Sequence, residues 1–168
     1  MSKRRSPRTR ASRVGACSWP KGDPLMEKYH DTEWGAPERN DKKIFCAILL
    51  DTFQAGLSWR IILHKRENFA KAFDNFNYEK IARYTTAQKA RLIKDSGIIR
   101  NRLKIVGTVE KAKAFIKVRR EFGTFSKYIW SFVENRSIVN KHKDSSSIGS
   151  RTKLSDKISA DMKSRGFK

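Results

Sequence analysis

Helical periodicity dominates the chain from residue 41 onward. Apolar residues recur three and four positions apart, the spacing that places them on one face of an α-helix. Neither an internal repeat nor a series of alternating strand-like segments is present. The pattern therefore predicts an all-α fold. The expected helices cover residues 41–55, 59–73, a short segment from 77, 87–97, 101–122, 125–134 and 155–166, with a polar loop over 140–153.

Polar residues and glycines mark the expected ends of these helices. Side chains with a hydroxyl, carboxylate or amide can accept hydrogen bonds from the unpaired amides of a first helical turn. We assign this role to Asn40, Asp41, Ser58, Asn77, Thr86 and Ser155. Glycine ends a helix because it tolerates the left-handed conformation, and Gly56, Gly123 and Gly166 are the expected stops.

The first fourteen residues differ from the rest of the chain. Residues 1–14, MSKRRSPRTRASRV, hold six basic residues, no acidic residue and almost nothing apolar. Such a segment cannot build a core, so we expect a disordered arm followed by one helical domain over 15–168. A non-specific DNA-binding arm, an organellar or nuclear address and a solubilising tail all remain open.

The net charge of the chain indicates what kind of partner it binds. Lys and Arg number 38 against 17 Asp and Glu, a formal net charge of +21, and a polyanion would offset the resulting self-repulsion. Nucleic acid is the first candidate, and a cationic surface of the kind found on ribosome-associated proteins is the alternative. Two cysteines indicate a reducing compartment, and no apolar run is long enough for a membrane helix. We expect a DNA-associated monomer in the cytoplasm.

An acidic residue follows the apolar run of residues 44–50. A buried carboxylate such as that of Asp51 costs several kcal/mol unless it is paired or hydrogen-bonded. Four aromatic residues could wall a pocket with this acid for a flat cationic ring, which would gain stacking and cation–π energy. They are Trp19, Tyr29, Trp34 and Trp59. The alternative is that these aromatic side chains simply fill a small core.

The segment KDSGIIRNRLKI, residues 94–105, has the pattern of a turn between two helices. Gly97 would permit a positive φ, and Asn101 can cap the second helix. The amides of residues 98–102 would then point outward together and form an anion site at a helix N-terminus. Positive charge would surround that site from Arg100, Arg102 and Lys104. The local pattern alone favours an ordinary helical hairpin.

Cys17 and His30 are candidate zinc ligands by residue type, since thiolate and imidazole both bind zinc. They lie thirteen positions apart, which is not a zinc-finger spacing. No second Cys–His pair completes four ligands. Spacing alone therefore favours a buried thiol and a surface histidine.

Six motifs together carry a family resemblance. YHDTEWG, FQAGLSWRIIL, RENF, GIIRNRLKI, WSFV and RGFK resemble, in order and spacing, the 3-methyladenine DNA glycosylase I family over about residues 17–168. The resemblance implies the all-α fold of the helix-hairpin-helix glycosylases. It also implies a monofunctional base-excision repair enzyme that flips 3-methyladenine out of alkylated double-stranded DNA and excises it.

The resemblance also implies roles for individual residues. The hairpin would grip the DNA backbone through Gly97, Ile98, Ile99, Arg100, Asn101 and Arg102. After Gly56, Leu57 would wedge into the base stack. The base-binding residues would be Tyr29, Trp19, Trp59 and Gln54. Cys17 and His30 match two of the four ligands of the family's structural zinc.

The implied chemistry requires little acid catalysis. 3-Methyladenine is already cationic, so selective binding of the charged base and of the oxocarbenium-like sugar can drive bond cleavage before water attacks. No lysine matches a Schiff-base nucleophile, so no strand-cleaving step is expected. The hypothesis for Asp51 is that its carboxylate accepts hydrogen bonds from the base, assisted by Tyr29.

Two departures from the family bear on these expectations. The family usually has Glu where this chain has Asp51, and the shorter side chain could withdraw the carboxylate by about 1.5 Å. The family also continues with a segment carrying a His and a Cys that complete the zinc site, whereas this sequence ends at Lys168. The expectation is a C-terminally truncated domain with doubtful zinc binding and uncertain activity. A fragment and a protein that has lost the zinc site both remain open.

The sequence therefore predicts a DNA-3-methyladenine glycosylase. The alternative from another class is a DNA-binding helix-hairpin-helix module with weak or no catalysis, which would keep the hairpin and the basic surface but lack a working pocket. An RNA-binding or ribosomal role is supported only by the net charge.

Overall fold

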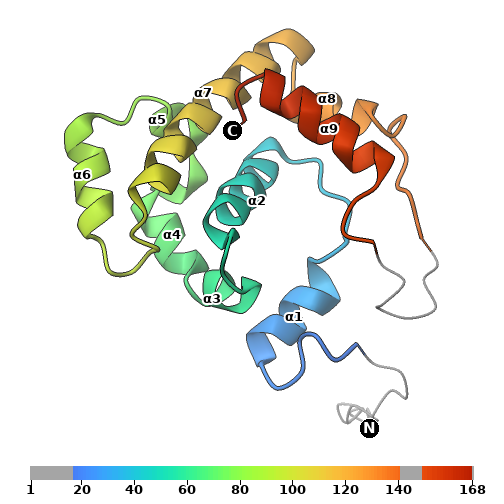
Figure 1. The fold of residues 1–168 in the computed structure, drawn as a ribbon, viewed down its shortest axis with the longest axis horizontal. Helices are drawn as coiled ribbons and strands as arrows, with labels where there is room; N and C mark the ends of the chain where they lie inside the picture. Colours follow the sequence, from blue (N-terminus) through green and yellow to red (C-terminus); the bar gives the residue numbers. More distant parts are fainter. Residues whose placement is uncertain (1–16, 141–148, 168) are drawn as a thin grey trace, which may run out of the picture. The chain divides into compact units, whose positions relative to one another are not determined.

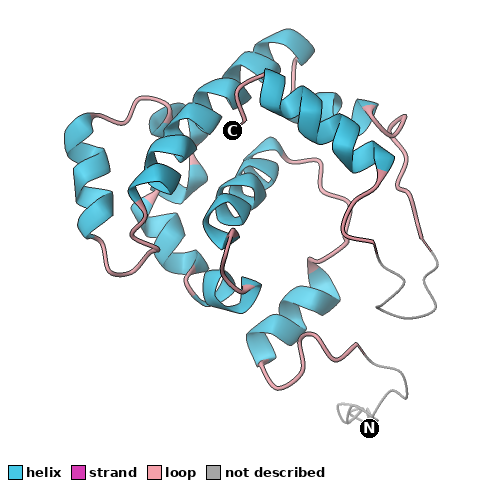
Figure 2. Ribbon diagram, viewed as in Figure 1, coloured by secondary structure: helices cyan, strands magenta, loops and turns pink. Residues whose placement is uncertain are grey.

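The computed structural model describes residues 17–140 and 149–167, and every regular element within them is helical (Figure 2). This confirms the predicted all-α fold. The arm expected over residues 1–14 lies outside the described residues. Among the described helices, none combines the length and apolar character needed to cross a bilayer. The chain divides into two compact units, Met1–Ala36 and Pro37–Lys168, which are described separately.

The first unit contains one helix that the periodicity did not predict, α1, Pro24–Thr32. Asp23 caps it, since one carboxylate oxygen accepts hydrogen bonds from the amides of Leu25 and Met26 at 3.0 and 3.2 Å. Proline at the first helical position needs no amide partner and already has a helical φ. The Asp23–Pro24 pair was therefore the sequence feature that could have predicted the start of α1. Met26 is the buried apolar residue of α1.

The second unit is a bundle of helices around α2. Its elements are α2 (Asp41–Gln54), α3 (Trp59–His64), α4 (Arg66–Ala72), the 3₁₀ turn η1 (Asp74–Phe76), α5 (Tyr78–Ile81), α6 (Thr86–Lys94), α7 (Arg102–Phe122), α8 (Phe125–Ser131) and α9 (Lys153–Ser164). In Figure 1, α2 lies near the middle of this unit and the long α7 crosses beside it. Helix α7 packs against α2, α5, α6 and α8, so it connects most of the bundle.

The core of the second unit is mainly aromatic. Phe45 and Phe53 lie on the inner face of α2 and are fully buried. Phe45 contacts Phe115 of α7 edge to face at 5.1 Å, and Phe115 stacks on Phe125 of α8 at 4.2 Å. Burying one such side chain stabilises the fold by roughly 2 kcal/mol. Aromatic packing therefore fixes α2, α7 and α8 against one another.

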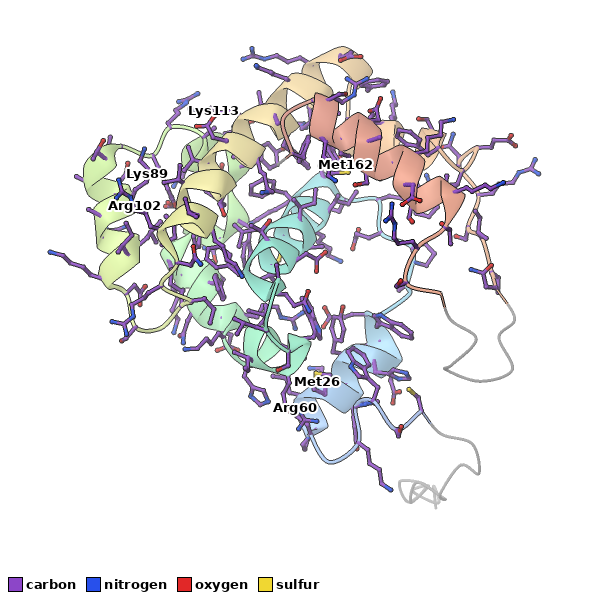
Figure 3. The ribbon with its side chains drawn as sticks, in the orientation of Figure 1. Met26, Arg60, Lys89, Arg102, Lys113 and Met162 are labelled. Carbon is purple, nitrogen blue, oxygen red and sulfur yellow. The ribbon has the colours of Figure 1, made fainter. Side chains whose placement is uncertain are left out.

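Helix α9 is held mostly by polar contacts and has no fully buried residue of its own. The carboxylate of Asp161 accepts hydrogen bonds from the Tyr128 hydroxyl at 2.6 Å and the Arg165 guanidinium at 2.7 Å. Burial, and then the hydrogen bond to Asp161, raise the pKa of Tyr128. Met162 points from α9 toward the core (Figure 3), and Phe167 is buried after the helix ends.

Several predicted helix ends are displaced. Thr85, not Thr86, caps α6, and Thr152, not Ser155, caps α9. In both cases the side chain at the third helical position accepts a hydrogen bond from the backbone amide of the capping threonine, which gives a reciprocal pair that a single cap does not provide. The segment expected as one helix over 59–73 is divided at Lys65 into α3 and α4.

Asp41 does not cap its own helix; Asn40 does. The Asp41 carboxylate instead accepts hydrogen bonds from the Arg119 guanidinium at 2.7 Å and from the amides of Phe125 and Ser126 at 3.0 and 2.8 Å. Its side chain is only 13% exposed. One carboxylate thus ties the start of α2 to the end of α7 and the start of α8.

We expect Asp41→Ala to lower the free energy of unfolding by about 3 kcal/mol, because it leaves a guanidinium and two amides without their acceptor. Urea unfolding followed by circular dichroism measures the change. Asp156→Ala is the matched control, since its ion pair with Arg151 is exposed and should contribute less than about 1 kcal/mol. Equal losses in the two variants would contradict this role for Asp41.

Candidate functional site

The turn after α2 contains the residue expected to act as a wedge. Gly56 has φ +81, which confirms its predicted role at the end of the helix. The Leu57 amide donates to the carbonyl of Gln54 at 2.7 Å, and the Gln54 side-chain amide donates back to the carbonyl of Leu57 at 3.1 Å. Leu57 is partly buried against the core. We call residues 54–58 the Leu57 turn; two reciprocal hydrogen bonds close it.

Lys104 occupies a different position from the one expected. Its ammonium donates to the carbonyls of Phe53 and Ala55 at 2.8 and 2.5 Å, at the C-terminal end of α2. A cation there complements the negative end of the helix dipole. The prediction that Lys104 surrounds the hairpin anion site with charge is therefore wrong, because the helix-end carbonyls engage its ammonium.

The hairpin loop, residues 95–101, connects α6 to α7. Gly97 does not have the positive φ predicted for it. Glycine is needed there for space, since an added Cβ would lie 3.0 Å from a carboxylate oxygen of Asp95 and 3.4 Å from Cβ of Asn68. That same carboxylate oxygen accepts a hydrogen bond from the Gly97 amide at 2.8 Å. Close approach, not backbone handedness, explains the glycine.

The loop amides are not all directed outward as predicted. The Asn101 amide donates within the loop to the carbonyl of Ile99 at 2.9 Å. The Asn101 side chain caps α7 as expected, accepting from the Lys104 amide at 3.1 Å. Ile98 is buried in the core, whereas Arg100 and Arg102 are exposed at the start of the 21-residue helix α7. Two of the three cations expected around the start of α7, Arg100 and Arg102, are therefore exposed there.

An exposed leucine at this helix end escaped the sequence analysis. Leu103 is 83% exposed, beside Arg102 in the first turn of α7. An apolar side chain of this size in water contributes nothing to the core. The helical period could have predicted this exposure, because Leu103 does not lie on the face of α7 that carries the buried Ile105 and Val109.

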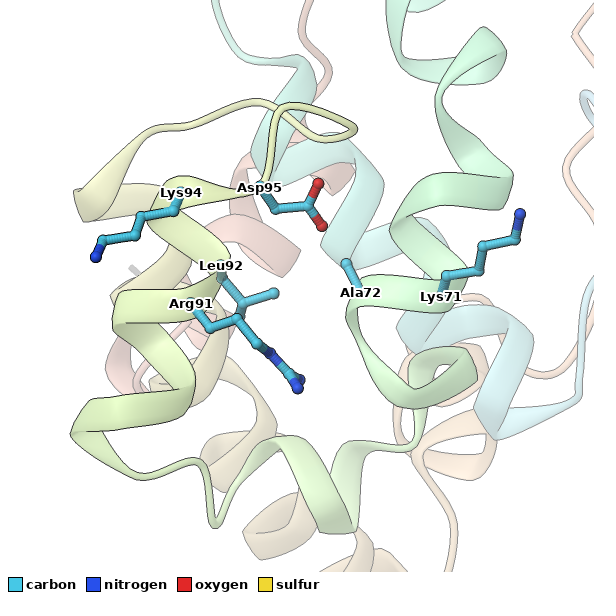
Figure 4. A pocket seen from close by; sticks show the side chains of 6 residues that line it. All are labelled: Lys71, Ala72, Arg91, Leu92, Lys94 and Asp95. Carbon is cyan, nitrogen blue, oxygen red and sulfur yellow. The ribbon is translucent and has the colours of Figure 1, made fainter.

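A hollow of about 450 Å³ lies between α4 and α6, next to the hairpin loop. Arg91 and Asp95 extend toward it, and Lys71 and Lys94 stand at its edges (Figure 4). The Asp95 carboxylate there is the acceptor of the Gly97 amide. Basic side chains therefore continue from the start of α7 onto α4 and α6. The hollow is lined by Lys71, Ala72, Arg91, Leu92, Lys94 and Asp95.

Asp51 lies on the last turn of α2, one turn before the Leu57 turn. Water reaches the residue, yet enough protein surrounds its carboxyl group for desolvation to raise its pKa. Among the described residues, its carboxylate receives no hydrogen bond and forms no ion pair. A partly desolvated acid without a cationic partner is the arrangement expected of a group that binds a positively charged ligand.

Trp59 and Gln54 lie close to Asp51 in sequence, on the same segment of the second unit. Trp59 begins α3, which Ser58 caps as predicted by accepting from the Ile61 amide at 3.4 Å. Its indole packs partly buried against the core. The amide nitrogen of Gln54 is engaged within the Leu57 turn. The structure thus shows Gln54 positioning the turn, and its contact with a base stays a prediction.

The remaining predicted base-binding residues belong to the first unit. Trp19 contacts Tyr29 edge to face at 6.3 Å and Trp34 at 5.6 Å. His30 stacks on Trp34 at 5.4 Å. Trp19 and Trp34 are 42% and 55% exposed, so these rings do not fill a core. The first unit therefore gathers four aromatic rings around α1 and leaves two indoles open to water.

The predicted zinc ligands do not form a metal site among the described residues. Cys17 is an exposed free thiol, and the Nδ1 atom of His30 lies 3.1 Å from a carboxylate oxygen of Asp31. No group of three or more His, Cys, Asp or Glu side chains suited to a metal occurs in the described part of the chain. Structural zinc requires four ligands, so this donor set does not fit it.

We expect the purified chain to carry well below one zinc per molecule. Inductively coupled plasma mass spectrometry measures the metal content. Cys17→Ser is the informative variant, since it should change neither the metal content nor the melting temperature. One full equivalent of zinc that is lost with Cys17→Ser would contradict the expectation and show that ligands outside the described residues complete a site.

Comparison with known proteins gives a consistent assignment. The family model described as methyladenine glycosylase matches residues 19–168. The chain is 41% identical to DNA-3-methyladenine glycosylase 1 of Escherichia coli (strain K12) and 40% identical to DNA-3-methyladenine glycosylase of Haemophilus influenzae, covering 90% of this chain and 81% and 82% of those proteins. A crystal structure of 3-methyladenine DNA glycosylase I in complex with 3-methyladenine superposes with a TM-score of 0.87 at 32% identity, covering 90% of this chain and 82% of that one. The chain belongs to the methyladenine glycosylase family.

Proposed function

We propose that the chain is a DNA glycosylase that hydrolyses the N-glycosidic bond of 3-methyladenine in alkylated double-stranded DNA, acting as a monomer without a strand-cleaving step. The observation that carries the proposal is Asp51, a partly desolvated carboxylate with no hydrogen bond or ion pair among the described residues. Family membership supports it, as does the relative that was solved with 3-methyladenine bound.

The chemistry follows from the charge of the damaged base. 3-Methyladenine in DNA is cationic, so an ionised Asp51 attracts it more strongly than it attracts neutral adenine. Partial desolvation strengthens that attraction, because fewer water molecules screen the two charges. As the bond between C1′ of the sugar and the base nitrogen breaks, its electron pair neutralises the base. Water then adds to C1′ and one proton is released.

DNA binding is assigned to the second unit. The exposed Arg100 and Arg102 at the start of α7 offer charge to a phosphate, and the positive end of the helix dipole favours an anion there. The role proposed for Leu57 is to enter the base stack when the damaged nucleotide leaves it. This is the helix-hairpin-helix mode of binding. The proposed base contacts are Trp19, Tyr29, Trp59 and Gln54, and they remain predictions.

The direct test is release of free base. Duplex DNA treated with a methylating agent is incubated with the purified chain, and liquid chromatography identifies the liberated bases against those released by heat. We expect 3-methyladenine to be released in proportion to enzyme, without strand cleavage before alkali treatment. A chain that binds duplex DNA and frees no base at any dose would be a DNA-binding module instead of an enzyme.

Asp51→Asn separates activity from stability. We expect excision to fall on the order of 100-fold, the scale of losing one charged contact at a reacting centre. Desolvation raises the pKa of Asp51 above its ordinary 3.8, so its ionised form destabilises the fold. This cost appears as pH rises above the ordinary value and is complete once pH exceeds the raised pKa. The variant should therefore melt at the same or a higher temperature than the parent at pH 7.

The same raised pKa predicts the pH profile of the parent enzyme. Excision should decline as pH falls through the pKa of Asp51, and the decline should begin at a higher pH than an ordinary aspartate would give. Asp156→Asn is the control, because its carboxylate is exposed and paired with Arg151 on α9. Unchanged excision in Asp51→Asn, or a lower melting temperature at pH 7, would remove the assigned role.

A further inference from the structure

We propose that Lys65 and Lys104 form a reciprocal brace that couples the Leu57 turn to the hairpin loop, so that wedge insertion and backbone binding occur as one event. The inference rests on the proposed function, since it takes these two segments as the DNA contacts. Each lysine is a positioning residue and touches neither the base nor the sugar. The brace lies entirely within the second unit.

Each lysine follows one of the two segments along the chain and reaches the other. Lys104 lies in the first turn of α7, directly after the hairpin loop, and its ammonium reaches back to Phe53 and Ala55 at the Leu57 turn. Lys65 ends α3, which begins directly after the Leu57 turn, and its ammonium reaches the Gly97 carbonyl of the hairpin loop at 3.1 Å. Each DNA-contacting segment is thus held by the lysine that follows the other.

Further hydrogen bonds hold the hairpin loop at the point where Lys65 reaches it. The Ser96 carbonyl lies 3.4 Å from the Lys65 ammonium, and the Asn68 side-chain amide donates to the Gly97 carbonyl at 3.3 Å. The Gly97 amide is held by Asp95. Both polar groups of Gly97 are therefore fixed, and the absence of a side chain lets Asn68 approach. An ammonium has three donors and can hold two carbonyls at once, as Lys104 does.

Carbonyl acceptors have an electrostatic consequence. Neither Lys65 nor Lys104 forms an ion pair with a carboxylate among the described residues. Backbone carbonyls orient an ammonium without cancelling its charge. Each ammonium therefore keeps its positive charge while it positions a backbone segment. A salt bridge with a carboxylate at these positions would position the segment but neutralise that charge.

Coupling matters because the two segments must act at a fixed separation. The hairpin loop sets the position of the DNA backbone, and the Leu57 turn must then meet a particular base step. A displacement of about 1 Å at a reacting centre can cost on the order of 100-fold in rate. Along the chain, the six-residue α3 separates Lys65 from the Leu57 turn, and Lys104 follows the hairpin loop within the first turn of α7. Removing one ammonium should let the segments move independently.

The test compares Lys104→Met and Lys65→Met with Lys113→Met. Methionine keeps the apolar stem and removes the ammonium. Lys113 lies on α7 (Figure 3), the helix that also carries Lys104. It is exposed and pairs with Glu110, so it controls for the loss of one charge. In single-turnover excision of 3-methyladenine we expect a loss of about tenfold for each brace variant and less than about twofold for the control, with DNA affinity changed by less than about threefold. Lys104→Arg should recover most of the rate, since a guanidinium can donate to the same carbonyls.

A double-mutant cycle separates bracing from a general structural role. Leu57→Ala removes the wedge, so adding Lys104→Met to it should lower the rate by less than about twofold further. If the two losses multiply, Lys104 acts independently of the Leu57 turn and the brace is refuted.

Hydrogen exchange provides a readout that does not depend on activity. Lys104→Met should speed amide exchange over residues 54–58, and Lys65→Met over 96–99, while the aromatic core stays protected. Unchanged exchange in both variants would overturn the brace even in an active enzyme. A parent chain that releases no base would overturn the proposed function alone, because exchange would still report on the two lysines.

Discussion

The attachment of α2 to α7 at both ends is the constraint on which the second unit depends. At the start of α2 the carboxylate of Asp41 accepts hydrogen bonds from Arg119 and from the first amides of α8. At the other end the ammonium of Lys104 donates to the carbonyl of Ala55. The sign of each charge matches the helix end that it meets, negative at the N-terminus and positive at the C-terminus. Between these ends, aromatic packing fixes the inner face of the helix.

This attachment also fixes the helical turn that carries Asp51. Desolvation raises its pKa, so the ionised form is disfavoured in the free protein. A helix held only by local propensity could turn or fray near its end to hydrate such a group. Because Lys104 binds the carbonyls on either side of residue 54, the last turn of α2 cannot relax easily. The contacts that hold the end of the helix therefore also hold the turn of Asp51, the carboxylate proposed to bind a cationic base.

The sequence predicted features that depend on local pattern and missed those that depend on contacts between distant residues. The all-α fold, the cap at Asn40 and the glycine at 56 follow from helical period and local backbone preference. The direction of the Lys104 side chain depends on carbonyls 49 and 51 residues away, so no local signal could reveal it. Gly97 was identified as necessary for the wrong reason, because the space around it is limited partly by Asn68, which lies on α4. Thr85 and Thr152 were missed because a second hydroxyl residue, Thr86 or Ser155, lies within three positions and was assigned the cap instead.

The structure also shows how the positively charged side chains differ in their hydrogen-bond acceptors. Net charge alone predicts attraction to a polyanion, but it does not say which cations remain available. Arg119 and Arg165 bind carboxylates and hold the bundle together. Lys65 and Lys104 bind carbonyls, so they position backbone segments while keeping their charge. The distinction divides the cations by the acceptor that each one meets. Those with carboxylate partners stabilise the fold, and those with carbonyl partners or none set the field that a DNA backbone encounters.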